Sequence, residues 1–375
     1  MAKPWVRRRL NAVSPGGNGA SARRSASRSA LSLRTGLKDI GGGPVSAMAG
    51  SVNPLYAWHR GSQELERATA CHHAGVDAQR ITGTLAAAVT PLRDAGEHLD
   101  EAAIAPLCRF YRDSGIDGLL VLGTTGEGIL LSAPERRRMA ELAIEHAGPL
   151  RVIVHCGAQT TRETSALAEH AASAGADGVA VIAPPYFSFA ADELLEHFVA
   201  AARACAPLPF YVYEYAERSG YAVPIEVVEA LRERVPNLVG MKVSDAPFDR
   251  VEPYLGTGLD VFLGAEPVIP QGIAVGAIGA VSGVAAAFPE AVKALVEEPS
   301  SESSAVVASL REALSAFPFQ AAVKAALAMR GVPVRGDVRA PLLALSSDQL
   351  RDLRARLERI PGPTSDSVQA LSTRA

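Results

Sequence analysis

The 375-residue chain is 48% hydrophobic and 21% charged, a composition typical of folded globular proteins. Its net charge of −3 gives no electrostatic reason to bind nucleic acid or a membrane surface, and no apolar stretch approaches the about 20 residues that span a bilayer. The four cysteines are scattered without a Cys-x-x-Cys pair, which argues against a disulfide framework or a zinc site and favours the cytoplasm.

The first 80 residues form a basic segment rich in Ser, Gly and Ala. Residues 1–38 hold nine Lys and Arg and no acid. Such a composition cannot bury a core, so residues 1–80 are predicted to be a disordered extension. The segment resembles a transit peptide, but we favour a flexible tail or a translation start placed too far upstream, with Met48 as one candidate start. Cys71-His72-His73 lacks a second pair of ligands nearby, so no metal site is predicted.

From residue 82 onward, short apolar runs alternate with amphipathic segments. The runs lack strict polar–apolar alternation, as do strands that are covered on both faces. They span residues 83–89, 118–122, 151–156, 178–183, 209–215, 238–243, 259–264 and 277–282. Eight strand–helix units predict an α/β fold, a closed (β/α)8 TIM barrel over residues 81–300. A doubly wound open sheet is the alternative, but its first strand would precede a glycine-rich phosphate loop, whereas this one ends in Thr90-Pro91-Leu92.

The helices between the strands carry recognisable signals at their ends. Ser132-Ala-Pro-Glu135 is a capping box that begins a helix, and Thr161-x-x-Thr164 begins another that ends at Gly175. Three more helices are predicted over residues 192–204, 225–234 and 289–298. Beyond the barrel, residues 304–331 and 346–360 are helical stretches within a C-terminal extension, residues 301–362, that a flexible tail, residues 363–375, follows.

Lys242 is the most informative residue of the predicted strands, because it lies near the end of the apolar run 238–243. A surface lysine needs no explanation, whereas burial inside a barrel disfavours the charged ammonium. A neutral amine in an apolar pocket can attack a carbonyl carbon and form a Schiff base. If the barrel forms, this strand predicts a nucleophilic lysine.

Other chemistry-bearing residues follow the predicted strand ends, where this fold places its active sites. Gly123-Thr124-Thr125-Gly126-Glu127 combines two hydroxyls with a turn whose free amides suit a carboxylate. Read alone, the pentapeptide is better explained as a polar turn that happens to contain threonines. Tyr211, Tyr213 and Tyr215 share one face of their strand. We expect Tyr211 and Tyr215 to pack within the barrel, which leaves Tyr213 for chemistry.

The chain resembles the dihydrodipicolinate synthase / N-acetylneuraminate lyase family of class I pyruvate aldolases, over about residues 82–360. The resemblance rests on segments that occur in the family's order and near its spacing: the turn 123–127, Tyr213-x-x-x-x-Arg218-x-Gly220, Gly240-x-Lys242 and residues 276–283. It implies a barrel with extra C-terminal helices, small-molecule substrates, no cofactor, no metal and a homotetramer built as a dimer of dimers.

The resemblance also implies which residues are catalytic. Lys242 would condense with the keto group of pyruvate or another 2-oxo acid. Tyr213 would shuttle protons through a relay that runs to Thr124 and then to Tyr186, with Tyr186 reaching in from an adjacent subunit. A phenol needs such a relay because its pKa is normally near 10.

Four substrate-binding residues follow from the same resemblance. They are Thr125, Arg218, Gly264 and Val281. Thr125 would help to hold the carboxylate of the keto acid, and a guanidinium at Arg218 would bind a second carboxylate or a polar tail. The backbones of Gly264 and Val281 would lie beside the keto acid.

Two departures from the family's pattern are expected to alter the part of the pocket that binds the second substrate. Tyr213-Glu214-Tyr215-Ala216 replaces the usual Tyr-Asn-x-Pro, and Gly264-Ala265-Glu266-Pro267 lacks the paired acids of many lysine-pathway synthases. The function implied is a Schiff-base lyase or synthase that joins a 2-oxo acid to an aldehyde or cleaves the product, with an activity like that of 4-hydroxy-tetrahydrodipicolinate synthase as one option. Two alternatives stay open: a 2-keto-3-deoxy sugar acid aldolase or dehydratase that uses Glu214 and Glu266, and a catalytically silent keto-acid-binding paralogue.

Overall fold

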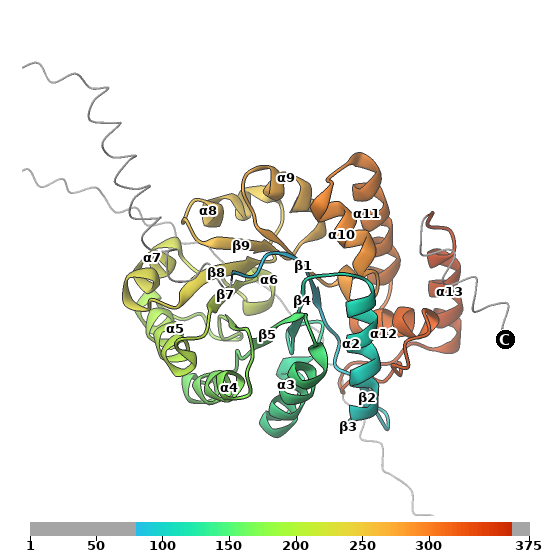
Figure 1. Cartoon of the computed structure of the whole chain (residues 1–375), viewed down its shortest axis with the longest axis horizontal. Coiled ribbons are helices and arrows are strands. Elements are labelled where there is room, and N and C mark those ends of the chain that lie inside the picture. Colours follow the sequence, from blue (N-terminus) through green and yellow to red (C-terminus); the bar gives the residue numbers. More distant parts are fainter. Residues whose placement is uncertain (1–79, 362–375) are drawn as a thin grey trace, which may run out of the picture. The chain divides into compact units, whose positions relative to one another are not determined.

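The structure is a computed structural model that describes residues 80–361. Eight parallel strands close into a barrel in the order β1-β10-β9-β8-β7-β6-β5-β4, and Figure 1 shows helices around them. The predicted (β/α)8 barrel is therefore confirmed. The strands are β1 (Gly83–Ala87), β4 (Gly118–Val121), β5 (Arg151–His155), β6 (Gly178–Ile182), β7 (Phe210–Glu214), β8 (Leu238–Val243), β9 (Asp260–Leu263) and β10 (Gly279–Ser282).

The barrel strands coincide with the predicted apolar runs because both of their faces are buried. Side chains that point inward pack with one another inside the barrel: Leu85, Leu120, Ile153, Ala180, Tyr211, Phe262 and Val281. Outward-pointing side chains join the larger core between strands and helices. Tyr211 packs against Phe262 with ring centroids 6.1 Å apart, which confirms its predicted place in the barrel interior.

Helices follow the barrel strands, and those over residues 133–147, 161–173, 191–205, 225–234 and 289–297 match the five predicted ones. The helices are α2 (Ile104–Asp113), α3 (Ala133–Ala147), α4 (Thr161–Ser173), α5 (Ala191–Cys205), α6 (Ala216–Ser219), α7 (Ile225–Arg234), α8 (Glu252–Leu255), α9 (Ile269–Ala274) and α10 (Pro289–Glu297). At the start of α3, the Glu135 carboxylate accepts hydrogen bonds from the Ser132 amide at 2.9 Å and its hydroxyl at 2.7 Å. Gly175, with φ +88°, follows α4, as expected of a glycine beyond a helix end.

Several short elements carry too few residues for a periodic signal and were not predicted. An antiparallel ribbon pairs β2 (Leu92–Arg93) with β3 (His98–Leu99). Its turn places Asp94, Ala95 and Gly96 at positive φ. The 3₁₀ helices are η2 (Glu101–Ala103), η3 (Gly128–Leu130), η4 (Phe248–Arg250), η5 (Glu266–Val268) and η6 (Val284–Ala286).

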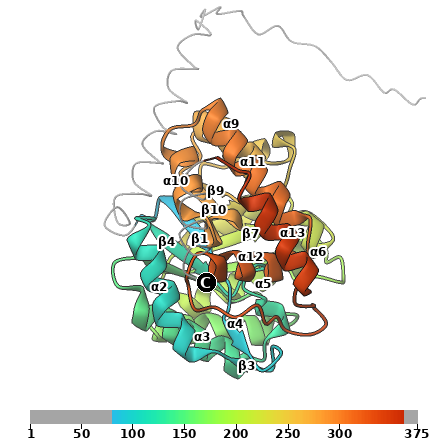
Figure 2. The ribbon, with the colours of Figure 1, turned by 90° about the vertical axis from the view of Figure 1, so that its right-hand side faces the viewer.

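The C-terminal extension contains α11 (Ser301–Ser315), α12 (Phe319–Met329) and α13 (Ser347–Leu357). The single helical stretch predicted over 304–331 is wrong, because Pro318 lacks an amide hydrogen and separates α11 from α12. Figure 2 shows α11 and α13 side by side. No helix within residues 80–361 is long and apolar enough to cross a membrane. The predictions for the N-terminal extension, Cys71-His72-His73 and the C-terminal tail concern residues outside the described range.

Candidate active site

Lys242 lies in β8, where its Cα pairs with Tyr213 of β7 and Phe262 of β9. The side chain is buried, with 6% of the residue exposed. Its Nζ lies 3.9 Å from the centre of the Tyr213 ring, so the amine contacts the electron-rich face of the phenol. The structure therefore places the predicted lysine inside the barrel and against the predicted proton carrier.

Tyr213 connects Lys242 to the loop that follows β4. Its hydroxyl lies 3.2 Å from the Thr124 Oγ1, within hydrogen-bonding distance. Behind it, His155 packs edge-on with ring centroids 5.7 Å apart. Burial lowers the pKa of His155 to about 3, so this imidazole is neutral. Because the His155 Nδ1 lies 3.0 Å from the Leu122 carbonyl oxygen, which only accepts, Nδ1 carries the ring proton.

A cavity of about 760 Å³ opens at the carboxyl ends of the strands. Seven of the predicted site residues line it: Thr124, Thr125, Tyr213, Arg218, Lys242, Gly264 and Val281. They belong to four strands or the segments that follow them, and to the loop after β4. The parallel barrel brings these distant parts of the chain to one mouth.

Arg218 and Tyr215 form one side of the cavity. The Arg218 guanidinium lies 5.5 Å from the centre of the Tyr215 ring and 3.5 Å from a carboxylate oxygen of Glu217. Tyr215 in turn stacks on Tyr213 with centroids 6.3 Å apart. The prediction that Tyr215 packs within the barrel is wrong, because the chain leaves β7 after Glu214 and turns Tyr215 toward the cavity.

Hydrogen bonds from two distant segments hold the loop that carries Thr124 and Thr125: the segment after β1 and helix α12. The Thr90 hydroxyl donates to the Gly126 carbonyl at 2.6 Å, and the Gln320 side-chain amide of α12 donates to the Thr124 carbonyl at 3.2 Å. A side chain at Gly126 would meet the Ala88 carbonyl oxygen at 2.9 Å, so only glycine fits there without a shift. These contacts fix the two threonine hydroxyls relative to Tyr213.

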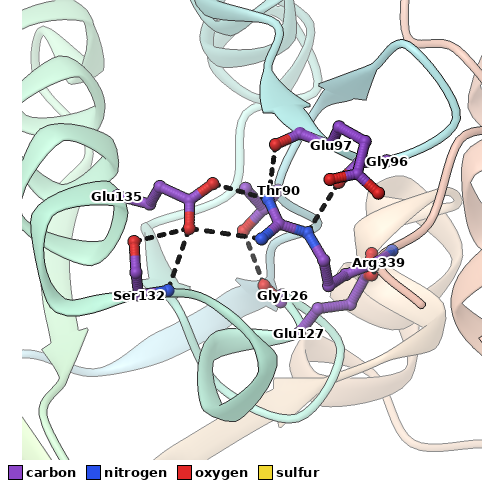
Figure 3. A network of polar contacts seen from close by, with 8 residues as sticks. All are labelled: Thr90, Gly96, Glu97, Gly126, Glu127, Ser132, Glu135 and Arg339. Carbon is purple, nitrogen blue, oxygen red and sulfur yellow. Dashed lines mark hydrogen bonds and ion pairs between the residues drawn. The ribbon is translucent and has the colours of Figure 1, made fainter. Parts of the chain in front are cut away.

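Glu127, at the end of this loop, forms a buried ion pair with Lys324 of α12. Its residue has positive φ, +57°, and its side chain is fully buried with that of Lys324. The Lys324 Nζ lies 2.5 Å from one carboxylate oxygen of Glu127, and the Arg339 amide donates to the other at 2.6 Å. Figure 3 shows the Arg339 side chain between Glu135 and the ribbon residue Gly96. Contacts from the C-terminal extension to Glu127 thus hold the loop that carries Thr124 and Thr125 in place.

Comparison with known proteins agrees with this geometry. The family model described as "Dihydrodipicolinate synthetase family" matches residues 80–360. The chain belongs to this family. It is therefore a lyase of the class I aldolase type, in which a lysine forms a Schiff base with a carbonyl compound.

Three relatives illustrate the range of the dihydrodipicolinate synthetase family. An uncharacterised DapA-like lyase of Halobacterium salinarum is 38% identical over 280 residues, which cover 70% of this chain and 89% of the relative. A 4-hydroxy-tetrahydrodipicolinate synthase of Prochlorococcus marinus is 34% identical over 273 residues, with the same two coverages, 70% and 89%. The structure of N-acetylneuraminate lyase from Proteus mirabilis aligns with a TM-score of 0.69 and 28% identity, over 75% of this chain and 100% of that one.

Tyr186 is the one predicted site residue of this family member that does not line the cavity. It follows β6 in a loop, 87% of it is exposed, and its φ is +87°. Its ring contacts Phe187 at a centroid distance of 4.8 Å. Of the three residues predicted to form a relay, the described chain places Tyr213 and Thr124 within hydrogen-bonding distance and leaves Tyr186 apart from them.

Glu214 does not contribute to the pocket, contrary to the interpretation made from the sequence. As the neighbour of Tyr213 in β7 it points out of the barrel, where its carboxylate accepts a hydrogen bond from the Val223 amide at 2.8 Å. Burial, together with the nearby Asp245 carboxylate, raises the pKa of Glu214 to about 8. Glu214 is consequently part of the strand–helix layer, whereas Asp245 lines the cavity.

Ser244 is a cavity residue that the sequence reading missed. It follows Lys242 by two positions and so shares its strand face, a signal that was available. The residue is 8% exposed, and its hydroxyl has no hydrogen-bonding partner among the described residues. A side chain on Gly264 would meet the Ser244 Oγ at 2.0 Å, which explains why glycine stands at position 264.

Proposed function

We propose that this lyase joins pyruvate, or another 2-oxo acid, to an aldehyde, or cleaves the product of that reaction, through an enamine on Lys242. One observation carries the proposal. The buried Lys242 amine lies 3.9 Å from the ring centre of Tyr213, whose hydroxyl is 3.2 Å from the Thr124 hydroxyl. A nucleophile beside a hydrogen-bonded pair of hydroxyls suits imine formation, because the hydroxyls can pass on the protons that addition and loss of water transfer.

In the proposed reaction the Lys242 nitrogen adds to C2 of the keto acid, and loss of water gives an iminium. The iminium withdraws electrons from C3, so a C3 proton leaves and an enamine forms. The enamine C3 then bonds to the aldehyde carbon, whose oxygen takes up a proton. Water adds to the resulting iminium and releases the product and the free lysine. Tyr213 and Thr124 carry the protons of these steps.

The carboxylate of the keto acid binds beside Thr124 and Thr125 in this proposal, with Gly264 and Val281 along the bound chain. Hydroxyls and amides in a turn suit a carboxylate because they donate without bringing a second charge close to Lys242. The hydrogen bonds of the loop to Thr90 and Gln320 support the proposal, since they fix these donors before the substrate arrives.

For the aldehyde, an activity like that of 4-hydroxy-tetrahydrodipicolinate synthase is favoured by the similarity to the Prochlorococcus marinus protein and by the Arg218 guanidinium at the cavity. An aldolase or dehydratase acting on a 2-keto-3-deoxy sugar acid is the second candidate. It is favoured by the unpartnered Ser244 hydroxyl, which could bind a hydroxyl group of such a substrate.

Sodium borohydride added with pyruvate is expected to leave a stable covalent adduct, because it reduces the imine to a secondary amine. Intact-mass measurement reports the adduct, and peptide mapping locates it at Lys242. Pyruvate without borohydride serves as the control and leaves the mass unchanged. If neither pyruvate nor any other short 2-oxo acid is trapped, the proposed chemistry is excluded.

We further propose that Tyr186 completes the relay from a neighbouring subunit of a homotetramer, a dimer of dimers. Support comes from its exposure on its own chain and from the exposed neighbour Phe187. Tyr186→Phe is expected to slow turnover about 100-fold, the usual lower effect of removing a proton-transfer group. Its half-saturation concentration for pyruvate in borohydride trapping is expected to change little. Equal losses in turnover and in keto-acid binding would instead indicate that Tyr186 only packs.

A further inference from the structure

Arg311 reaches the cavity from outside the barrel. It belongs to α11, the first helix of the C-terminal extension, and its guanidinium lies over the Phe319 ring at 4.6 Å from the ring centre. Both residues line the cavity, and the Arg311 side chain is 39% exposed. None of the sequence motifs that predicted the site includes Arg311. The cavity therefore has a second guanidinium besides Arg218 that can face a substrate group far from Lys242.

Glu266 holds Arg311 in place. The Glu266 residue is 4% exposed, and its Oε2 accepts a hydrogen bond from the Arg311 guanidinium at 3.2 Å. The other carboxylate oxygen accepts from the Ser282 hydroxyl at 2.7 Å and from the Val284 amide at 3.2 Å. A buried carboxylate with this many donors is fixed in position.

Glu266 lines the cavity, but protein donors already engage both of its carboxylate oxygens. A carboxylate accepts and does not donate, and three protein donors already occupy its oxygens. Arg311 differs, because a guanidinium has five N–H donors. Among the described residues, Glu266 is the only hydrogen-bonding partner of Arg311. Arg311 therefore retains donors for a ligand in the cavity.

The charges that line the cavity balance once Lys242 is set aside, so a remote anion site depends on which guanidinium keeps free donors. Besides Lys242, the cationic lining residues are Arg218, Arg250 and Arg311, and the acidic ones are Glu217, Asp245 and Glu266. Two of these acids already form ion pairs with lining arginines: Glu217 with Arg218, and Glu266 with Arg311. A guanidinium that is fixed on one side by a carboxylate and on the other by an aromatic ring is ordered before a ligand arrives, which reduces the entropic cost of binding.

We propose that Arg311 is a specificity residue that binds a carboxylate at the end of the substrate remote from Lys242, and that Glu266 is its positioning residue. The proposal rests on the proposed imine chemistry and narrows it. Condensation of pyruvate with an aldehyde that bears a carboxylate gives a 2-oxo diacid, so both the aldehyde and the product would carry the anion. Arg218, at the exposed edge, is then a second contact for the same end of the substrate.

The test compares imine formation with 2-oxo acids that differ only at the remote end. The diacids are 2-oxoglutarate, 2-oxoadipate and 2-oxopimelate, and their partners are 2-oxopentanoate, 2-oxohexanoate and 2-oxoheptanoate. Each is trapped with borohydride over a concentration series, and intact mass gives the half-saturation concentration. For at least one chain length, the diacid is expected to saturate the wild-type enzyme at a concentration about 10- to 100-fold lower than its partner, as a hydrogen bond to a charged group predicts.

Arg311→Met removes the cation but keeps an apolar side chain over Phe319. It is expected to abolish most of the preference for that diacid, and because the preference is a ratio, a general loss of lysine reactivity cancels. Glu266→Gln keeps the acceptor for Ser282 but loses the charge that orients Arg311, so an intermediate preference is expected. Arg356→Met is the matched control. Arg356 is 38% exposed and lies 5.7 Å from the centre of the Phe317 ring, yet it does not line the cavity.

The outcomes distinguish a failure of the Arg311 proposal from a failure of the proposed imine chemistry on Lys242. No adduct with pyruvate would overturn the imine chemistry and this inference with it. A pyruvate adduct without a preference for any diacid would overturn the role of Arg311 alone. The role of Arg311 would also be overturned if Arg311→Met kept the preference for the diacid. It would likewise be overturned if Arg356→Met reduced this preference as much as Arg311→Met does.

Discussion

Replacement of Lys242 by alanine is expected to abolish the borohydride-trapped pyruvate adduct and to lower turnover by roughly 10⁴-fold or more, as loss of a covalent nucleophile does elsewhere. The reason is chemical: no other side chain contributes an amine to the cavity among the described residues. Intact mass measures the adduct, and consumption of pyruvate with a panel of aldehydes measures turnover. Circular dichroism checks that the barrel is intact.

Two further variants make this result specific to the lysine. Lys242→Arg keeps a long basic side chain beside the Tyr213 ring but cannot form an imine with a ketone, so it is expected to be as inactive as the alanine variant. Lys293→Ala removes a lysine that lies in α10 and donates to the Gly115 carbonyl, away from the cavity. It should retain the adduct. An adduct that persists in Lys242→Ala, or that disappears in Lys293→Ala, would refute the assignment.

Replacement of Lys324 by methionine is expected to lower the free energy of unfolding by about 3–5 kcal/mol, the usual effect of removing one partner of a buried ion pair. Both side chains of the Lys324–Glu127 pair are fully buried, so Glu127 would be left as an uncompensated charge. Urea titration followed by circular dichroism measures the change. Because Glu127 ends the loop that carries Thr124 and Thr125, turnover should fall as well.

The double variant Lys324→Met/Glu127→Gln tests whether the unpaired charge is the cause. It removes both charges, and an amide at position 127 can still accept a hydrogen bond from the Arg339 amide. We expect it to recover more than half of the lost stability. Arg351→Met is the control, since its ion pair with Asp348 is exposed and such pairs contribute about 0–1 kcal/mol. A Lys324→Met protein as stable as the wild type would show that the pair is unimportant.

The strands and most helices could be predicted because their signals are local. A run of apolar residues forms a strand covered on both faces, and a capping box such as Ser132–Glu135 begins a helix wherever it occurs. Most of the elements that were missed are short, but α2 was also not predicted, although its ten residues are amphipathic. The ribbon of β2 and β3 has two residues in each strand, and Pro318 divides a helical pattern that otherwise continues.

The mouth residues Lys242, Tyr213 and Thr124 could also be predicted, because the closed barrel gathers the carboxyl ends of its strands at one mouth. Strand alternation by itself would have found Ser244. It also explains why Glu214 faces away from the cavity: adjacent residues of a strand point to opposite faces.

Sequence by itself determined the barrel, the position of Lys242 in a barrel strand and the loop that carries Thr124 and Thr125, since each depends on neighbours close along the chain or on strand ends that the fold brings together. Only the tertiary structure decided what supports and surrounds them. Arg311 meets Glu266 across 45 residues, and Lys324 meets Glu127 across 197. A contact between side chains so far apart depends on how the C-terminal helices pack over the barrel, and no local pattern records that packing.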